Sequence, residues 1–146
     1  MRNLFRNIEP AAVFAARLLI GWIFIYDAVD AIVHYGAVGD YLESNGVSNQ
    51  LLPLAIVTEL IGGILVAVGW YTRLASLALA GFCLLTALLF HAHFGDPIEV
   101  IHFNKDLAIA GGFLALVAFG AGRWSLDVRF ARRRPASAQR SGRVAL

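Results

Sequence analysis

The sequence predicts an all-α protein, a bundle of four transmembrane helices with both termini on the cytoplasmic side. Of its 146 residues, 59% are hydrophobic and only 15% are charged, and the mean hydropathy is +0.69. Soluble domains contain about 25% charged and 45–50% apolar residues. The composition therefore excludes an ordinary soluble domain, and it equally excludes a disordered chain, which would be poor in apolar residues.

Four apolar stretches are long enough to cross a bilayer, because a helix rises about 1.5 Å per residue and the hydrocarbon core is about 30 Å thick. They cover residues 17–35, 51–70, 74–93 and 105–121. We assign residues 1–128 to one four-span membrane domain. The arginine-rich tail, 129–146, is expected to be disordered and to lie against anionic headgroups in the cytoplasm.

The first two stretches are delimited by residues that interrupt or start helices. Gly36, Gly39 and Asn45-Gly46 end the first stretch. Pro53 suits the first helical turn of the second, where a missing N–H does no harm. A cleavable signal peptide is the alternative interpretation of the first stretch. Arg17 argues against it by interrupting the apolar run, and no convincing cleavage site follows.

The last two stretches are bounded by clear turn residues. Trp70-Tyr71-Thr72-Arg73 predicts a tight turn at a membrane interface, where aromatic and basic side chains are common. Gly95-Asp96-Pro97 ends the third stretch and Gly120-Ala121-Gly122 ends the fourth. His102 is expected in the loop that precedes the fourth helix.

Basic residues are distributed very unevenly over the two sides of this bundle. Seven of the twelve follow position 122, and Arg2, Arg6, Arg17 and Arg73 fall on the same side, which leaves Lys105 on the other. Cytoplasmic flanks of membrane proteins are enriched in Lys and Arg. We therefore expect a multi-pass protein of a bacterial-type inner membrane with both termini inside, and we do not read the charge as a nucleic-acid footprint.

The two halves of the chain resemble each other. Ala16-Arg17-Leu18 opens the first stretch and Thr72-Arg73-Leu74 opens the third, while Gly62-Gly63 and Gly111-Gly112 lie inside the second and fourth. The pattern suggests two duplicated helical hairpins, although any bundle has arginines at its inner ends and glycines at its contacts. Small residues allow close packing of helices in lipid. Gly21, Gly62, Gly63, Gly81, Gly111 and Gly112 are therefore expected at helix contacts, and such contacts also permit homo-oligomers.

Ionisable residues gather in the half of the bundle that lies away from the termini. Asp27, Asp30 and His34 share one helix face, at i, i+3 and i+7. Glu59 lies at a similar depth in the second stretch, and His91 lies near the end of the third. A charged side chain at the bilayer centre costs about 2.5–3.5 kcal/mol. These side chains must therefore face a protein interior or water.

This cluster predicts a polar pocket that could bind a quinone. A quinone needs an apolar slot, hydrogen-bond donors to its two carbonyls and a source of protons. His34 and His91 would donate hydrogen bonds, and Asp30 or Glu59 would relay protons as the catalytic groups. Lys105 would contact the bound molecule, or it would simply pair with Glu59 or Asp30.

Other interpretations of the cluster stay open. A b-type haem could take His34 and His91 as axial ligands, but dihaem four-helix cytochromes need histidines near both faces. A metal site is not expected, because the only close ligand spacing is His91-x-His93. Glu59 could instead serve proton-linked binding or transport of a small solute. The bundle could also be a structural anchor for a partner protein.

Several short motifs, in this order, resemble the DoxX family. They are Ala16-Arg17-Leu18-Leu19-Ile20-Gly21, Glu59-Leu60-Ile61-Gly62-Gly63, Thr72-Arg73-Leu74-Ala75, Asn104-Lys105-Asp106-Leu107-Ala108 and Arg123-Trp124-Ser125-Leu126-Asp127, within residues 12–128. The resemblance implies a four-helix membrane protein related to subunits of a thiosulfate:quinone oxidoreductase. It further implies a soluble or peripheral redox partner that would supply electrons, and we do not predict that this chain is a complete enzyme by itself.

The resemblance also favours certain charged positions as those around which the fold is built. These are Arg17, Glu59, Arg73, Lys105 and Asp106; Arg17, Asp27, Arg73 and Asp106 are assigned to a structural polar network. One stretch departs from the family pattern: where members often carry a late Lys in the first helix, this chain has Ala28-Val29-Asp30-Ala31. The departure suggests a subgroup with its own ligand. The single cysteine, Cys83, argues against thiol–disulfide exchange by this chain.

Overall fold

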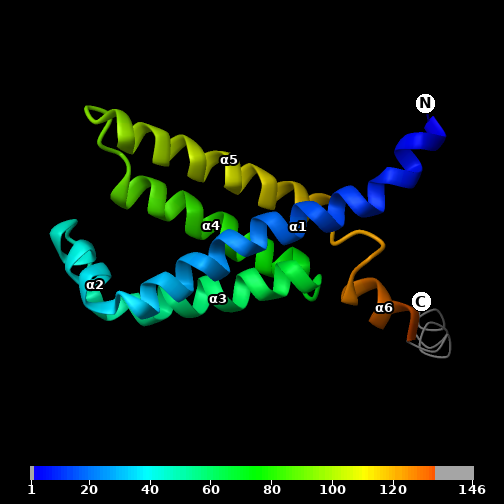
Figure 1. Ribbon diagram of the computed structural model, residues 1–146, viewed down its shortest axis with the longest axis horizontal. Helices are drawn as coiled ribbons and strands as arrows, with labels where there is room; N and C mark the ends of the chain where they lie inside the picture. Colours follow the sequence, from blue (N-terminus) through cyan, green and yellow to red (C-terminus); the bar gives the residue numbers. More distant parts are fainter. Residues whose placement is uncertain (1, 134–146) are drawn as a thin grey trace, which may run out of the picture.

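The computed structural model describes residues 2–133, and over this range the regular structure is helical (Figure 1). The elements are α1 (Arg2–Val33), α2 (Tyr35–Ser44), the 3₁₀ turn η1 (Asn49–Leu51), α3 (Leu52–Val68), α4 (Thr72–Phe90), α5 (Pro97–Phe119) and α6 (Leu126–Arg133). The segments long and apolar enough to span a membrane are Ile8–Val33, Asn49–Val68, Thr72–Phe90 and Pro97–Phe119. The predicted all-α fold with four spans is confirmed.

The four long helices form two hairpins. α1 packs along α3, α4 packs along α5, and α3 also contacts α4. In Figure 1 the hairpins come together near the end that carries both termini and diverge toward the end that carries α2. We call the first the terminal end, with the N-terminus, the turn at residues 69–71 and α6. The other is the pocket end, with α2, η1 and the loop at residues 91–96.

The outer surface of the hairpins is apolar. Large side chains on three different spans point away from the protein, with Leu19 73%, Leu74 67% and Phe119 86% exposed. An apolar surface of this extent would be an association-prone patch in water, whereas hydrocarbon solvates it. The protein is therefore an integral membrane protein.

Two hydrophobic clusters hold the helices together. The larger lies where the hairpins meet and contains Phe24, Leu79 and Phe113. The rings of Phe24 and Phe113 are 5.3 Å apart between centroids. The smaller cluster lies at the pocket end, where Leu42 of α2 and Leu52 of α3 are buried together. This second cluster anchors α2 against the first hairpin.

Glycines bring α1 and α3 into backbone contact. A Cβ added to Gly21 would lie 2.7 Å from the carbonyl oxygen of Gly63, and one added to Gly63 would lie 2.9 Å from that of Gly21. The predicted contact role is thus confirmed for this pair. The predicted role is wrong for Gly81 and Gly111 as contacts between helices of the same chain, because a Cβ at either position would meet nothing within 4 Å. These two glycines face away from the neighbouring helices.

We expect Gly63→Ala to destabilise the protein by about 1–3 kcal/mol, because a methyl group is forced between two backbones that cannot give way. Gly111→Ala is the matched control, since its methyl group enters open space. Thermal unfolding in detergent micelles measures both variants. Equal midpoints for the two variants would contradict the contact.

The first span ends earlier than predicted, and a further helix follows it. The break falls at His34, with φ −106° and ψ 32°, and α2 then runs through Gly36 and Gly39 to Ser44. A glycine inside a helix costs only about 1 kcal/mol relative to alanine. Burial of Leu42 against α3 offsets that cost. The start of α3 is as predicted, with Pro53 in its first turn.

The last span begins earlier than predicted, at Pro97 rather than at residue 105. The Asp96 carboxylate caps α5 by accepting a hydrogen bond of 2.8 Å from the Ile98 amide. Asp-Pro therefore starts a helix here as well as ending the preceding segment. His102 lies within α5 and not in the predicted loop. Polar side chains at a membrane boundary occur in helices as well as in loops, so they do not by themselves indicate irregular structure.

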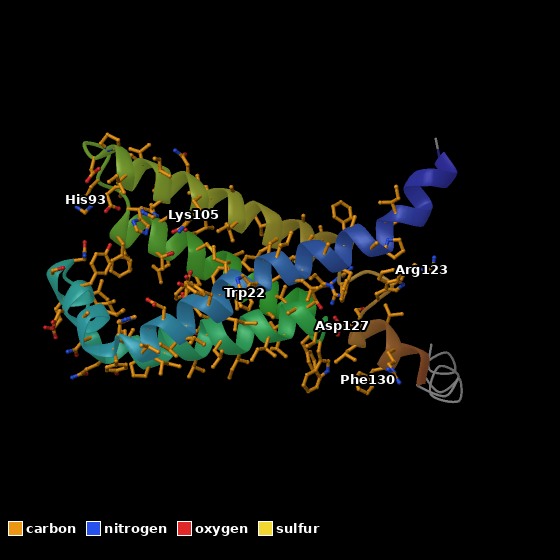
Figure 2. The ribbon with its side chains drawn as sticks, viewed as in Figure 1. Trp22, His93, Lys105, Arg123, Asp127 and Phe130 are labelled. Atoms are coloured by element: carbon orange, nitrogen blue, oxygen red, sulfur yellow. The ribbon has the colours of Figure 1, made fainter. Side chains whose placement is uncertain are left out.

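The predicted tail begins inside α6, which extends to Arg133. Its first residues, 129–133, are helical and not irregular, and residues 134–146 lie outside the described part of the chain. Figure 2 shows Arg123, Asp127 and Phe130 at the terminal end and His93 at the opposite end.

Candidate functional site

The main functional candidate is a pocket of about 470 Å³ at the pocket end. Binding sites for small molecules usually measure about 300–1,000 Å³. Its walls come from α1, α2, η1, α3 and α4 and are mostly apolar. The lining residues are Asp27, Asp30, Ala31, Val38, Tyr41, Leu42, Val47, Leu51, Leu52, Leu54, Ala55, Thr58, Glu59, Phe82, Leu85, Thr86, Leu89 and Phe90. We call it the hairpin pocket, because it lies between the two hairpins where they diverge.

Three carboxyl groups line this pocket, as the sequence predicts. Asp27 and Asp30 come from one face of α1, and Glu59 comes from α3. No Lys, Arg or His is among the lining residues in the described chain. The ionisable lining groups are thus acidic, apart from the phenol of Tyr41.

The two histidines assigned to the site lie outside the pocket lining. The His34 side chain is 59% exposed, and its Nδ1 lies 3.1 Å from Oδ1 of Asp30, one turn earlier on the same helix. That contact holds the imidazole along the surface of α1. Asp30 is therefore shared between the pocket and His34.

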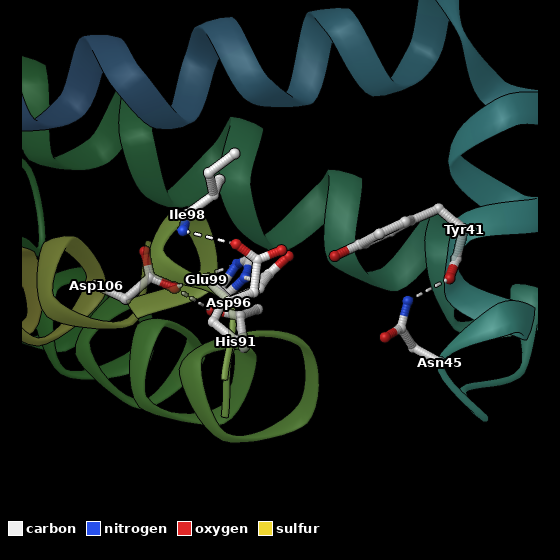
Figure 3. A network of polar contacts seen from close by, with 8 residues as sticks. Tyr41, Asn45, His91, Asp96, Ile98, Glu99 and Asp106 are labelled. Carbon is white, nitrogen blue, oxygen red and sulfur yellow. Dashed lines mark hydrogen bonds and ion pairs between the residues drawn. The ribbon is translucent and has the colours of Figure 1, made fainter. Parts of the chain in front are cut away.

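His91 belongs to a second polar cluster beside the pocket (Figure 3). Its Nδ1 lies 2.6 Å from Oε2 of Glu99, and its Nε2 lies 3.9 Å from Oδ2 of Asp106. The ring also stacks on His102, with 5.1 Å between centroids. All three partners come from α5, so starting α5 at Pro97 is what builds this cluster.

Thr86 connects the second cluster to the pocket. Its hydroxyl lies 3.3 Å from Oδ2 of Asp106, and the residue also lines the pocket. The same hydroxyl lies 3.1 Å from the Phe82 carbonyl oxygen, one turn earlier on α4. Thr86 therefore stands in the wall between the pocket acids and the His91 cluster.

Tyr41 approaches the same cluster from α2. Figure 3 shows its side chain directed toward Glu99 across the end of the bundle. Burial and the negative charge of Glu99 raise the pKa of Tyr41 above its ordinary value of 10.0. The ring stacks on Phe90, with 5.7 Å between centroids, which fixes its position at the pocket rim.

We expect Glu99→Gln to lower the pKa of Tyr41 toward its ordinary value. The glutamate carboxylate disfavours the tyrosinate anion, and a neutral amide removes that repulsion while the effect of burial stays. A pH titration of the Tyr41 ring carbon by NMR measures the change, with Glu43→Gln on the same helix as the control. An unchanged or higher pKa in Glu99→Gln would contradict the contact.

Arg17 lies at the terminal end, far along α1 from the pocket. It is completely buried, and its Nη2 donates a hydrogen bond to the Trp124 carbonyl oxygen. Nearby, the carboxylate oxygens of Asp127 accept hydrogen bonds from the amides of Tyr71 at 2.8 Å and Thr72 at 3.0 Å. These contacts hold α6 against the turn between α3 and α4.

The predicted polar network is therefore two separate groups. Arg17 and Arg73 lie at the terminal end, where Nη2 of Arg73 donates to the Ala118 carbonyl oxygen at 3.3 Å. Asp27 and Asp106 lie at the pocket end. Lys105 is exposed on α5, and among the residues described it forms no ion pair with Glu59 or Asp30.

The positions of the histidines do not fit a bis-imidazole haem. His34 is exposed beside Asp30, while His91 is enclosed by Glu99 and Asp106. No three His, Cys, Asp or Glu side chains within the described range are grouped so that they could hold a metal ion.

Three site residues were not found from the sequence. Thr86 looks like an ordinary polar residue in an apolar helix, and only its spacing of five before His91 hints at a shared cluster. Tyr41 and Glu99 fall in stretches predicted to be loops. In the structure both lie on helices, Tyr41 in the pocket wall on α2 and Glu99 beside His91 on α5.

Comparison with known proteins identifies the family. The DoxX family profile matches residues 12–92. The chain is 39% identical to inner membrane protein YqjF of Escherichia coli (strain K12), over 84% of this chain and 94% of that protein. It is 30% identical to inner membrane protein YphA of the same strain, over 86% and 94%, respectively. It is also 30% identical to the uncharacterized membrane protein Rv3486 of Mycobacterium tuberculosis (strain ATCC 25618 / H37Rv), over 90% and 88%.

No solved structure matches the chain. The profile covers more than half of the sequence, and the relatives match along nearly their whole lengths. These relatives are themselves inner membrane proteins, which agrees with the four spans found here. The chain therefore belongs to the DoxX family.

Proposed function

We propose that the protein binds a quinone from the bilayer in the hairpin pocket, as the membrane subunit of an oxidoreductase whose peripheral partner supplies electrons. The observation that carries the proposal is an apolar pocket, open between membrane helices, with three carboxyl groups in its wall. Apolar walls with a few convergent polar groups are typical of small-molecule sites.

The carboxyl groups provide what a quinone requires. Phe82, Leu85 and Leu89 line one side of the pocket and would provide an apolar wall for the ring and the start of its tail. A protonated carboxyl group of Asp27 or Glu59 would donate a hydrogen bond to a quinone carbonyl. When the quinone accepts two electrons from the partner, two such groups would deliver two protons, and the product is a quinol. The acids are then reprotonated from water.

We further propose that both termini face the cytoplasm. Eleven of the twelve basic residues lie toward the terminal end or in the segment that follows it, and cytoplasmic flanks are rich in such residues. The hairpin pocket would then open in the outer half of the membrane.

A second candidate ligand is a lipophilic organic cation, bound in exchange for protons. It is favoured by the absence of basic side chains among the lining residues described. A cation requires a carboxylate in the ionised form, whereas a quinone carbonyl requires a donor. The two candidates therefore respond differently to an amide in place of Glu59.

The test of quinone binding is mass spectrometry of an organic extract of the purified protein. The wild type and Ala78→Phe, which adds a ring to the exposed face of α4, should both carry quinone. Ala55→Phe adds the same ring inside the pocket wall and should abolish quinone retention. Equal quinone in all three proteins, or none in the wild type, would contradict the proposal.

A further inference from the structure

We infer that Glu99, His91, Asp106 and Thr86 form a proton path from the surface at the pocket end to the acids of the hairpin pocket. The inference rests on the proposed function only for the end point of the path, because the pocket acids must exchange protons to act on a bound molecule. It assigns roles to Glu99 and Thr86 and gives His91 a role outside the pocket.

The path begins at the first turn of α5. The Glu99 side chain is 26% exposed and lies 2.6 Å from His91, which is 19% exposed. This is a short contact between a carboxylate and an imidazole, and it fixes Nδ1 as the nitrogen that faces the surface side. His91 can take up a proton there and release one from its other nitrogen, Nε2.

The path continues through α5 to the wall of the pocket. Nε2 of His91 faces Oδ2 of Asp106, whose side chain is 12% exposed, at 3.9 Å. That distance exceeds a hydrogen bond, so one bridging water or a small rotation of the ring completes the step. The same Oδ2 lies 3.3 Å from the Thr86 hydroxyl. Exposure of the side chains thus falls at each step from Glu99 to Asp106.

Thr86 delivers the proton into the pocket. Its hydroxyl accepts a proton from protonated Asp106 while it gives its own proton to the pocket side, toward water or a carboxylate of Asp27 or Glu59. The charge of Thr86 is unchanged by this exchange, and Asp106 returns to its anionic form. One proton has then moved from outside to a pocket acid.

The groups that face the path come from two neighbouring elements. His102 of α5 stacks on His91 at 5.1 Å between centroids. Tyr41 of α2 lies near Glu99 and feels its charge. Within the described chain, no Lys or Arg forms an ion pair with a member of the path. The path therefore consists of groups that can carry a proton in sequence.

The chain offers an unusually close control for Thr86. Thr58 also lines the pocket, and its hydroxyl donates to the Leu54 carbonyl oxygen at 2.8 Å, one turn earlier on α3. Thr86 makes the corresponding contact with Phe82. The two threonines differ in that only Thr86 has a contact with a carboxylate in the described structure.

The experiment is a rapid pH jump on the full chain in detergent, followed by infrared absorption of protonated carboxyl groups. The band of Glu59 is identified by its loss in Glu59→Gln. We expect Thr86→Val and His91→Gln to slow protonation of that band by at least about tenfold. Thr86→Ser restores the hydroxyl and should recover the wild-type rate, and Thr58→Val should leave it unchanged. Circular dichroism verifies that each variant is folded.

The outcomes separate this inference from the proposed function. Wild-type rates in Thr86→Val and His91→Gln, equal slowing in Thr58→Val, or a Glu59 band that never titrates would each overturn the proton path. Quinone plays no part in the measurement. A protein that retains no quinone but shows the expected rates would contradict the proposed function and leave the path supported.

Discussion

Replacement of Glu59 by Leu should weaken binding of a short-tailed ubiquinone analogue by about ten- to hundredfold. The change keeps the pocket filled but removes a polar group from its wall. A quinone carbonyl left without its hydrogen bond against an apolar wall costs about 1–3 kcal/mol, and 1.4 kcal/mol corresponds to tenfold in affinity. Binding is measured by quenching of intrinsic tryptophan fluorescence in detergent.

Glu59→Gln is the informative companion variant. An amide can donate a hydrogen bond to a quinone carbonyl, so quinone affinity should stay within about threefold of the wild type. An amide carries no negative charge, so binding of a lipophilic cation would fall as far as it does in Glu59→Leu. Equal loss of quinone binding in both variants would contradict a donor role for Glu59. Unchanged binding in Glu59→Leu would remove Glu59 from the site.

Gly69→Ala should destabilise the protein by about 2–5 kcal/mol, the largest structural effect that we expect. Gly69 ends α3 in the left-handed region, with φ 74° and ψ 43°. A Cβ there would overlap Nη1 of the buried Arg17 and lie 2.6 Å from Cβ of Ser125. The Gly69 carbonyl oxygen also accepts a hydrogen bond of 2.8 Å from the Asp127 amide. The substitution therefore disturbs α1, the turn and α6 together.

Gly46→Ala separates the two causes of this destabilisation, the left-handed backbone conformation and the overlap of the new Cβ with its neighbours. Gly46 has nearly the same φ, 76°, but a Cβ there would meet nothing within 4 Å. Gly46→Ala should lower the free energy of unfolding by about 1–2 kcal/mol, which is the cost of placing an alanine in the left-handed region. Thermal unfolding in detergent compares the variants. If Gly69→Ala loses no more stability than Gly46→Ala, the packing of Arg17 does not require the space beside Gly69.

The sequence was sufficient to predict the membrane fold, because the bilayer imposes simple rules. Span length follows from the thickness of the hydrocarbon core, and the existence of a tight turn between the second and third spans and the stop at Gly120 follow from local chemistry. The predicted helix boundaries were wrong at α2 and at the start of α5. Both lie near the membrane boundary, where polar side chains and glycines occur in helices as well as in loops.

The carboxyl groups of the site could also be predicted, since an acid in an apolar helix needs a polar environment. Asp27 and Asp30 share a face by helical spacing alone. The partners of His91 could not be predicted, because they depend on which helices pack together and in what register. Glu99 and Asp106 reach His91 across the second hairpin, from residues 8 and 15 positions later in the chain.

The most direct test of the central claim is photolabelling of the reconstituted protein with a light-activated quinone, followed by mapping of the labelled peptides. The account predicts labelling of residues 82–90 of α4 and 52–59 of α3, which form the pocket walls, and loss of that label when an excess of unreactive quinone is present. Labelling spread over the lipid-facing surfaces, with no protection by competing quinone, would contradict a quinone site in the hairpin pocket.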